Sequence, residues 1–543
     1  MMITPTIHTA KFPGRARLYL DVLYDPDRAG AFFLWPHPTP AAFECCARRL
    51  DYPAVERSRA AAMLVRQNRE FGAPPPALTA AGELAEEGAV VAFTGQQAGL
   101  FGGPLYTVYK AVTLLGWAAR LRAILNRPVI PVFWIAADDH DFEEIRWTGL
   151  PDTENQVRRL LLTVDGLPPR TPASRIRLGA QISNVLADLR AAQLPTEFSD
   201  AVCAALAADY APEHTMVEAF GRWMTRVLGP LGLVLFNPAD PEARSLAAPL
   251  LAQEVTGHAE TAAALAENCQ RLEESGYHRQ VAHPEGHTHL FHVQNGRHAI
   301  RAADGKLWTD QDDRPLDPQE WLARLEDDPA AFSPGVLLRP VVQSYLFPVV
   351  AAVCGPSEIA YWAQARALFD RFGPTMPVVL PRSSATIIER KVKSAVEALG
   401  HEVPEFLGDI EALINKHFER SFPADLGTRF AGEKRQWEER LSRLKESVVA
   451  FEPTLGKTFD VDGGKIAASW DHLEKKVFQA HKRRGDEIRA KFYKLAAHLY
   501  PEGKPQERVF GVVYYLNKYG PGFLDAVQRQ LRIDTPDHQL IEP

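Results

Sequence analysis

Cysteine is scarce in this sequence of 543 residues, and no two cysteines have the spacing of a zinc site or a redox pair. Only five are present: Cys45 and Cys46 are adjacent, whereas Cys203, Cys269 and Cys354 are isolated. No C-x-x-C motif occurs, so the sequence supports neither a disulfide framework nor a thiolate zinc site. We therefore expect no zinc.

The chain also lacks a large excess of charge of one sign. Its net charge is -7 and its pI is near 6.2, which argues against a generally basic nucleic-acid-binding protein. The N-terminus, MMITPTIHTAKFPGRARL, lacks the apolar run of a secretory signal. The longest uncharged apolar region, PVVQSYLFPVVAAVCGPS, is interrupted by polar, proline and glycine residues, unlike a membrane span. We expect a cytoplasmic protein with neither a membrane nor a nucleic acid as its partner.

What the sequence does contain is five short apolar runs that alternate with helical patterns. The runs are GAVVAF, PVIPVFWIAA, LGLVLF, PVVAAVC and MPVVL. Short apolar runs bounded by turn residues predict strands that are buried on both faces. With 46% apolar residues and this length, the chain has room for two to four domains, at least one of them an α/β domain with a parallel sheet.

Polar residues follow every one of these runs. The polar ends are Thr94–Gln97, Asp138–Asp141, Asn237–Asp240, Gly355–Glu358 and Pro381–Ser384. Ligands of open α/β sheets bind at the carboxyl ends of the strands, so we predict that these ends line one cleft. The alternative, that polar residues only cap strands and begin helices, would account for any single run.

The first run leads into a glycine-rich loop and a helix, TGQQAGLFGGPLYTVYKA. Pro104 suits the first position of a helix. The glycines and the helix N-terminus predict a cradle for an anion or phosphate, although neither a Walker motif nor G-x-G-x-x-G is present. The candidate binding residues of this segment are Thr94, Gly95, Gln96, Gln97, Tyr106 and Lys110.

The second run ends in FWIAADDHDFEEI, with four consecutive ionisable side chains from Asp138 onward. Crowded carboxylates raise one another's pKa, so one of them can accept a proton, hold a substrate ammonium group or bind Mg²⁺. Asp139, His140 and Asp141 are the catalytic candidates, together with Gln97. The alternative is that Asp141 only caps a helix with an acidic first turn.

These two segments resemble the cysteine-adding enzyme family of bacillithiol biosynthesis. The resemblance extends to Ser333–Gln364, Pro377–Thr386 and Pro505–Gly520, in order along nearly the whole chain. It implies a Rossmann-like core related to class I aminoacyl-tRNA synthetases and nucleotidyltransferases, with inserted segments and a helical coiled-coil domain. It also implies a ligase that joins L-cysteine to glucosaminyl-malate in the last step of bacillithiol synthesis.

The resemblance also implies where substrates bind. It assigns Gly95, Gln96, Gln97, Asp139, His140, Asp141, Arg339, Gln343, Gly355, Glu358, Arg382 and Ser383 to the site. The strand ends add Asn237 and Ser357. The HxGH and KMSKS motifs of class I enzymes are absent: GLFGGP has no histidine, and PRSSAT stands roughly where KMSKS would. This departure argues against standard adenylation by ATP.

The segments on either side of the helical domain suggest a nucleotide site. Hydroxyl groups, an arginine and tyrosines suit a phosphate and a stacked base, so we predict that ATP or ADP binds where the core meets the arm. The alternative is that these polar groups only fasten the C-terminal helices to the core. The cofactor-binding candidates are Ser384, Thr386, Arg508, Tyr515, Asn517 and Lys518.

Two further segments complete the predicted core, residues 1–384. Residues 160–330 are connecting insertions: a mostly helical part is followed by a hairpin that turns at Asn295–Gly296. The hairpin region is rich in histidine, which suggests a metal site or, alternatively, a solvated or substrate-flanking hairpin. Its histidines are His278, His283, His287, His289, His292 and His298.

Residues 385–504 are predicted to form a coiled-coil arm. Trp437, Leu441, Leu444 and Val448 follow one heptad pattern, and a second follows after the linking segment EPTLGKTFDVDGG. Exposed apolar positions on two such helices predict a homodimer. Residues 505–543 are apolar again and should dock on the core. The alternative function is a non-catalytic dimeric scaffold or RNA-binding protein with a vestigial nucleotide fold.

Overall fold

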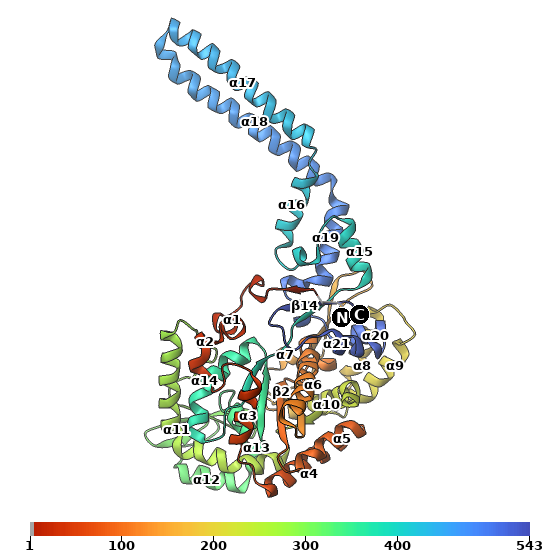
Figure 1. Ribbon diagram of the computed structural model, residues 1–543, viewed down its shortest axis with the longest axis vertical. Coiled ribbons are helices and arrows are strands. Elements are labelled where there is room, and N and C mark those ends of the chain that lie inside the picture. The colour runs from red at the N-terminus through yellow and green to blue at the C-terminus, as the bar shows by residue number, and fades with distance from the viewer. Residues whose placement is uncertain (1–4) are drawn as a thin grey trace. The chain divides into compact units, whose positions relative to one another are not determined.

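A computed structural model describes residues 5–543, which divide into two compact units (Figure 1). The core unit runs to Arg390 and includes Lys504–Pro543, and the arm unit is Lys391–Gly503. The C-terminal segment therefore belongs to the same unit as the N-terminal part of the chain. Among the described residues, no helix is both long and apolar enough to cross a membrane.

The core unit contains a five-stranded parallel sheet, which confirms the predicted α/β class. Each strand coincides with one of the five apolar runs, and nearly all strand residues are buried. The order across the sheet is β12-β11-β2-β3-β6. The strands are β2 (Val90–Gln96), β3 (Val129–Ile135), β6 (Val234–Phe236), β11 (Val349–Cys354) and β12 (Val378–Pro381).

The strand order places a crevice between β2 and β11. From β2 the chain adds β3 and then β6 on one side, and it later adds β11 and β12 on the other side. Connections therefore leave β2 and β11 in opposite directions, which is the arrangement that opens a ligand crevice at the carboxyl ends of two neighbouring strands.

Alternate residues of β2 face two different hydrophobic clusters, as the two-residue period of a strand requires. Val90 and Ala92 pack in the cluster that includes α6 (Leu105–Leu125). Val91 and Phe93 pack in the cluster that includes α11 (Pro241–Glu274) and α14 (Pro356–Phe372). The sheet is thus covered on both faces.

The insertion after β3 contains the predicted hairpin. Strands β7 (His287–Val293) and β8 (Arg297–Ala303) pair in antiparallel fashion and are joined at Asn295–Gly296. Gly296 has a φ of +131°, which favours glycine at this turn. Two more strands complete a sheet of order β10-β7-β8-β9: β9 (Lys306–Trp308) and β10 (Phe332–Pro334). The helices of the insertion include α8 (Gln181–Ala192), α9 (Ser199–Asp209) and α10 (Met216–Leu228).

The C-terminal segment is tied to the core unit by a small sheet. β14 (His538–Ile541) pairs in parallel with β13 (Ala385–Ile387) and in antiparallel fashion with β1 (Thr6–Ile7). The helices α20 (Val512–Tyr519) and α21 (Gly522–Gln530) precede it and contribute buried apolar side chains to the cluster around α6.

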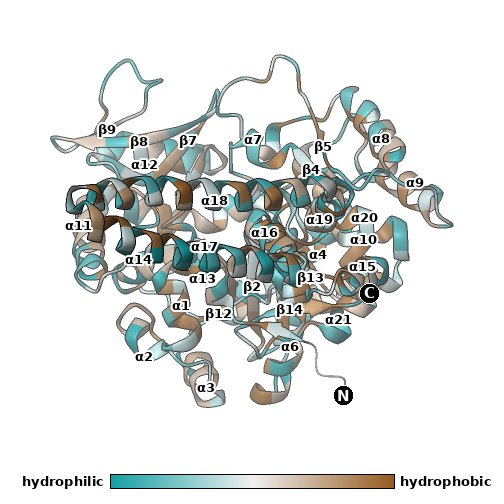
Figure 2. Cartoon of the chain, turned by 90° about the horizontal axis from the view of Figure 1, so that it is seen from above, coloured by the Kyte–Doolittle hydropathy of each residue, from teal (hydrophilic) through white to brown (hydrophobic). Residues whose placement is uncertain are grey.

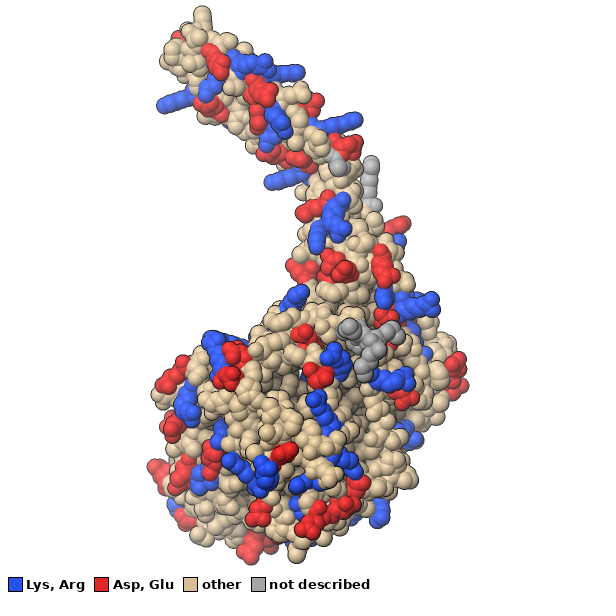
Figure 3. All heavy atoms as spheres, viewed as in Figure 1, with Lys and Arg blue, Asp and Glu red and all other residues tan. Residues whose placement is uncertain are grey.

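The arm unit contains the predicted pair of long helices, α17 (Ala424–Phe451) and α18 (Gly456–Arg484). Lys434 pairs with Asp471 at 2.5 Å, and Lys445 pairs with Asp460. From the first pair to the second, the residue number rises on α17 and falls on α18, so the two helices are antiparallel. Figure 2 shows hydrophilic and hydrophobic residues along both helices, and on the face in Figure 3 their acidic and basic side chains are interspersed. Other arm helices are α16 (Ile410–Ser421) and α19 (Asp486–Leu499), and α15 (Arg390–Ala398) leads into the unit.

The predicted linking segment of the arm was too long. Only residues 452–455 separate the two long helices, and the glycine-containing part of EPTLGKTFDVDGG lies within α18. A Cβ atom on Gly463 would lie 2.8 Å from Leu441 Cδ2. Glycine at this position therefore permits close packing of the two helices, and this tertiary contact outweighs its low helix propensity.

Candidate active site

A cavity of about 310 Å³ lies at the carboxyl ends of β2 and β11, where the strand order predicts a crevice. Its lining comes from Thr94–Gln97 at the carboxyl end of β2 and from Cys354–Glu358 at the carboxyl end of β11, with Tyr106 and Lys110 from α6. This volume lies at the lower end of the range of small-molecule sites. We refer to it as the main cleft.

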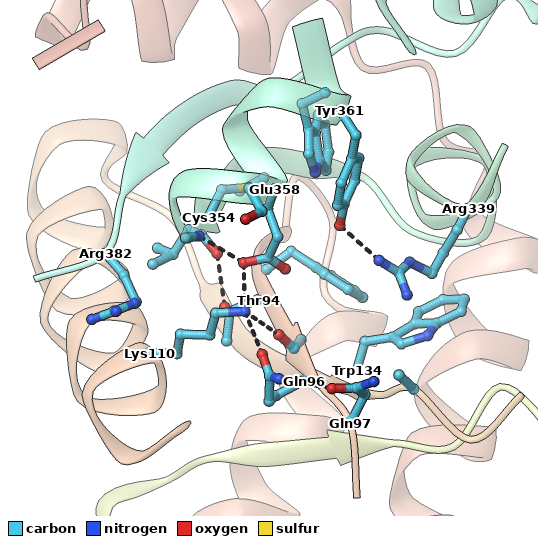
Figure 4. A pocket seen from close by; sticks show the side chains of 18 of the residues that line it. Thr94, Gln96, Gln97, Lys110, Trp134, Arg339, Cys354, Glu358, Tyr361 and Arg382 are labelled. Atoms are coloured by element: carbon cyan, nitrogen blue, oxygen red, sulfur yellow. Dashed lines mark hydrogen bonds and ion pairs between the residues drawn. The ribbon is translucent and has the colours of Figure 1, made fainter. Parts of the chain in front are cut away.

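Lys110 organises the floor of the main cleft (Figure 4). Its side chain is only 3% exposed, and its Nζ donates hydrogen bonds to the Gly95 carbonyl at 2.7 Å and to Gln96 Oε1 at 2.8 Å. It also forms an ion pair with Glu358, which accepts a hydrogen bond from the Gly355 N–H at 2.6 Å. Burial lowers the pKa of Lys110, and the carboxylate of Glu358 opposes that shift. Three partners match the three donors of an ammonium group, so Lys110 holds the floor together.

Gln97 joins two carboxylates at the edge of the main cleft. Its Nε2 donates to Asp139 Oδ2 at 2.6 Å and to Glu144 Oε2 at 2.7 Å. Within residues 5–543, neither carboxylate forms an ion pair with a lysine or arginine. Two carboxylates that share only one neutral donor leave acceptor capacity for a cationic group, such as a substrate ammonium.

Cationic side chains lie on the other parts of the lining. Figure 4 shows Arg339 and Arg382 on opposite sides of Lys110. Arg339, at the start of α13 (Arg339–Leu346), donates to the Tyr361 hydroxyl at 2.6 Å. Arg382 binds both oxygens of Glu507, at 3.1 and 2.6 Å. Burial alone would raise the pKa of Glu507, but the Arg382 guanidinium lowers it to about 2, so this pair stays charged.

Aromatic side chains and a thiol that sequence reasoning missed complete the lining. Trp134, Tyr361, Trp362 and Cys354 all face the main cleft. Tyr361 follows Glu358 by three positions on α14, so it lies on the same helix face, a spacing from which it could have been found. Burial raises the pKa of the Tyr361 hydroxyl and of the Cys354 thiol, so both stay protonated near neutral pH.

The four ionisable residues after β3 do not share one environment. Asp139 alone lines the main cleft. Asp138 forms an ion pair with the buried Arg244, and His140 lines a second cavity. Asp141 caps the short helix α7 (Phe142–Ile145): its Oδ1 accepts a hydrogen bond from the Glu144 N–H at 3.2 Å. The contacts of Asp141 are therefore those of a helix cap, which was the alternative to a catalytic role.

Two predicted substrate-binding residues lie outside the main cleft. The Asn237 N–H donates to Gln67 Oε1 at 2.8 Å, and its own Oδ1 accepts from the Ala239 N–H at 3.0 Å, so Asn237 stabilises the turn after β6. The Ser383 hydroxyl donates to the Arg532 carbonyl at 2.9 Å and is buried. In contrast, Gln343, Gly355, Ser357 and Arg382 all contribute to the lining.

The residues predicted to hold a nucleotide all belong to the core unit, and most have partners within it. Ser384 and Thr386 both form hydrogen bonds to one buried histidine, His538, at 2.7 and 2.8 Å. Tyr515 stacks on Phe523, Asn517 donates to the Leu194 carbonyl, and Lys518 pairs with Glu389. Only Arg508 faces the main cleft. These contacts favour the alternative, in which the polar groups fasten the C-terminal helices to the core.

Two glycines of the glycine-rich loop pack against the core. A Cβ atom on Gly102 would lie 3.1 Å from the Trp223 ring, and one on Gly99 would lie 2.7 Å from Gly103 Cα. These glycines therefore permit tight core packing. At the start of α6, the Leu105 N–H donates to the Phe510 carbonyl at 2.8 Å, so the helix N-terminus is covered by the C-terminal segment. These contacts explain Gly99 and Gly102 by packing, and the phosphate cradle stays a prediction.

Comparison with known proteins places the chain in a family. Residues 2–383 match the N-terminal Rossmann-like domain of the bacillithiol biosynthesis protein BshC, and residues 385–543 match its C-terminal coiled-coil domain. The chain belongs to the BshC family. The predicted resemblance is thereby confirmed, as is the combination of a Rossmann-like domain with a coiled-coil domain.

Relatives in this family match along nearly their full length. A protein of Salinibacter ruber is 34% identical over 99% of this chain and 98% of its own. A protein of Symbiobacterium thermophilum is 33% identical over 96% and 97%, and one of Geobacillus thermodenitrificans is 28% identical over 98% of both chains. All three are named "Putative cysteine ligase BshC". These names support the prediction of a ligase.

Proposed function

We propose that this chain is a ligase that forms an amide bond between the carboxyl group of L-cysteine and the amine of glucosaminyl-malate. The observation that carries the proposal is the pair of carboxylates, Asp139 and Glu144, that Gln97 holds at the edge of a cleft whose lining also includes three arginines. Such a cleft offers one region to an amine or ammonium group and another to an anion.

The carboxylate region suits the attacking amine. An ammonium group between Asp139 and Glu144 would have two charged acceptors, and it must lose a proton before its nitrogen can attack. Asp139 Oδ2 already accepts from Gln97, and Asp139 Oδ1 accepts from the Asp141 N–H at 3.1 Å, so the carboxylate is held in one orientation. We assign Asp139 as the proton acceptor and Gln97 as the residue that positions it.

The cationic region suits an activated carboxyl group. For the amide to form, the new C–N bond replaces a C–O bond, and the departing oxygen must leave on a good leaving group. ATP would supply it by transfer of a phosphoryl group to the carboxyl oxygen with release of ADP, or of an adenylyl group with release of pyrophosphate. The oxygen then departs as phosphate or as AMP, and Mg²⁺ would be the counter-ion of the ATP phosphates. Arg339 has N–H groups beyond the one bound to Tyr361, and Arg508 also lines the main cleft. We assign these two arginines to the carboxyl group and the phosphates.

A product assay with matched variants tests the proposal. The purified full chain is incubated with L-cysteine, ATP, Mg²⁺ and glucosaminyl-malate, and mass spectrometry detects the condensed thiol. We expect Glu144→Gln to reduce the rate by roughly tenfold or more, because a cation-binding carboxylate is lost. Glu143→Gln is the control: this neighbouring side chain is 77% exposed and pairs with Arg146. No product from folded wild-type protein would favour the non-catalytic scaffold instead.

A further inference from the structure

A second cavity, of about 220 Å³, lies beside the hairpin of β7 and β8. Its lining comes from three segments that are distant in the sequence: the turn after β3, the loop before α8, and the hairpin with the loop that follows β9. The ionisable residues of this lining are His140, Arg170, His287, Arg297, Arg301 and Asp310. We refer to this space as the hairpin cavity.

The hairpin cavity has more cationic than anionic side chains. Three arginines line it, and Asp310 is its only acidic residue among the described lining. Asp310 is already engaged by Arg170 at 2.7 Å and by His298 at 2.5 Å. Its charge therefore offsets Arg170 and leaves the other two arginines without a carboxylate inside the cavity.

Among the described residues, the hydrogen bonds of Arg297 go only to neutral acceptors. Its guanidinium stacks 3.7 Å from the Phe291 ring centre and donates to Ser333 Oγ at 3.1 Å and to the Pro334 carbonyl at 2.8 Å, which are neutral acceptors. Burial lowers the pKa of Arg297 to about 10, against the opposing effect of Asp138 and Asp139. Burying a guanidinium among neutral groups is costly, and an anionic ligand would offset that cost.

His140 adds a polar atom without a partner. Its Nδ1 is buried and makes no hydrogen bond within the described chain. Burial and the nearby Arg297 lower the pKa of His140, so the ring is neutral near pH 7 and can donate one hydrogen bond. A buried nitrogen without a partner, beside cationic side chains, is what a site for an anionic group would contain.

The hairpin cavity and the main cleft lie on two sides of one turn. Asp139 lines the main cleft and the next residue, His140, lines the hairpin cavity. The Cα atoms of successive residues are about 3.8 Å apart, so the two cavities are lined by neighbouring residues of one turn. A substrate that extends around this turn would place its amine near Asp139 and a second group among the arginines.

We propose that the hairpin cavity binds the dicarboxylate end of the amine substrate. Carboxylate pairs match the paired N–H groups of arginine, and two arginines without carboxylate partners suit a dianion. The identity of this end as a malate group rests on the proposed function, whereas the preference for a small dianion rests on the cavity alone. A phosphate group has a similar negative charge and similar hydrogen-bond acceptors, and separate titrations with malate and with inorganic phosphate distinguish the two ligands.

Calorimetric titration of the full chain with L-malate, and separately with inorganic phosphate, tests the proposal. Wild-type protein should bind malate in preference to phosphate. Arg301→Gln should weaken malate binding by about tenfold, the loss of one charge-assisted hydrogen bond. Arg301 forms no ion pair within the described chain, so the variant should fold. Arg314→Gln, on the same insertion but paired with Glu320 outside the cavity, is the control and should bind like wild type.

The outcomes distinguish this proposal from the proposed function. Equal malate affinity in wild type and Arg301→Gln would overturn the hairpin cavity as the site. Tighter binding of phosphate than of malate, with the same loss in Arg301→Gln, would overturn the dicarboxylate assignment. If the wild type binds malate through Arg301 but forms no thiol product, the cavity stands and the ligase does not. In an active enzyme, Arg301→Gln should raise KM for glucosaminyl-malate and leave KM for cysteine unchanged.

Discussion

Removing the Lys110 ammonium should destabilise the core unit far more than removing a surface charge. Lys110 is 3% exposed and Glu358 is 19% exposed, so their ion pair is largely shielded from water. Lys110→Met would leave Glu358 with only the Gly355 N–H as a partner and would leave the Gly95 carbonyl without the Nζ donor. Breaking a buried pair typically costs 3–5 kcal/mol, and we expect about 3 kcal/mol because Glu358 is partly exposed.

A double-mutant cycle separates the pair from its surroundings. Glu358→Gln alone should also destabilise, because it leaves a buried ammonium with two neutral acceptors. The double variant should cost less than the sum of the single variants, with a coupling of about 1–3 kcal/mol. Urea unfolding followed by tryptophan fluorescence measures these values, since Trp134 and Trp362 line the same cleft.

The control is an ion pair on the same helix that is exposed. Arg122, at 47% exposure, pairs with Glu83, and exposed pairs contribute about 0–1 kcal/mol. Arg122→Met should therefore change the free energy of unfolding by less than about 1 kcal/mol. If Lys110→Met costs no more than this control, or if its effect simply adds to that of Glu358→Gln, the reasoning about a coupled buried pair is refuted.

Three further predictions use other parts of the chain. Gln97→Ala should abolish thiol formation while leaving the melting temperature within a few degrees; a large loss of stability with retained activity would make Gln97 structural. Leu441→Glu with Leu444→Glu should give monomers by light scattering, since Leu444 is 55% exposed on the arm; a monomeric wild type at micromolar concentration would contradict a dimer through the arm. Burial raises the pKa of Glu254 to about 7, so the wild-type protein loses stability as the pH rises through 7 and Glu254 gives up its proton. This loss should lower the unfolding free energy by an amount on the order of 3 kcal/mol between pH 5 and 8, and Glu254→Gln should abolish that decrease. The same pH dependence in the variant and the wild type would contradict this role of Glu254.

The sheet was predictable because its strands carry their own local signal. Each apolar run is long enough for one buried strand and is followed by polar or turn-favouring residues, as at Gly355 after β11. The order of the strands has no such signal, because it depends on which crossovers pack well in three dimensions. The crevice between β2 and β11 could therefore be expected only as a general feature of α/β sheets.

Side-chain direction was the least predictable feature of the site. The glycines around Gly102 look the same in sequence whether they approach a phosphate or a neighbouring Trp223, and only the packing decides. Similarly, Ser384 and Thr386 have the hydroxyl groups of a nucleotide site, but both turn toward His538, a residue more than 150 positions away. Contacts between distant segments of this kind leave no local pattern.

The turn at Asp138–Asp141 shows how one acidic motif can serve several purposes. Like charges placed close together repel, so adjacent ionisable groups are more stable in separate surroundings. The structure distributes them among Arg244, the main cleft, the hairpin cavity and the start of α7. The Asp138–Arg244 pair anchors the turn to α11 and thereby fixes the neighbouring residues. Under the proposed arrangement of the substrate, Asp139 and His140 contact opposite ends of one ligand, and this anchored turn would hold both side chains in place.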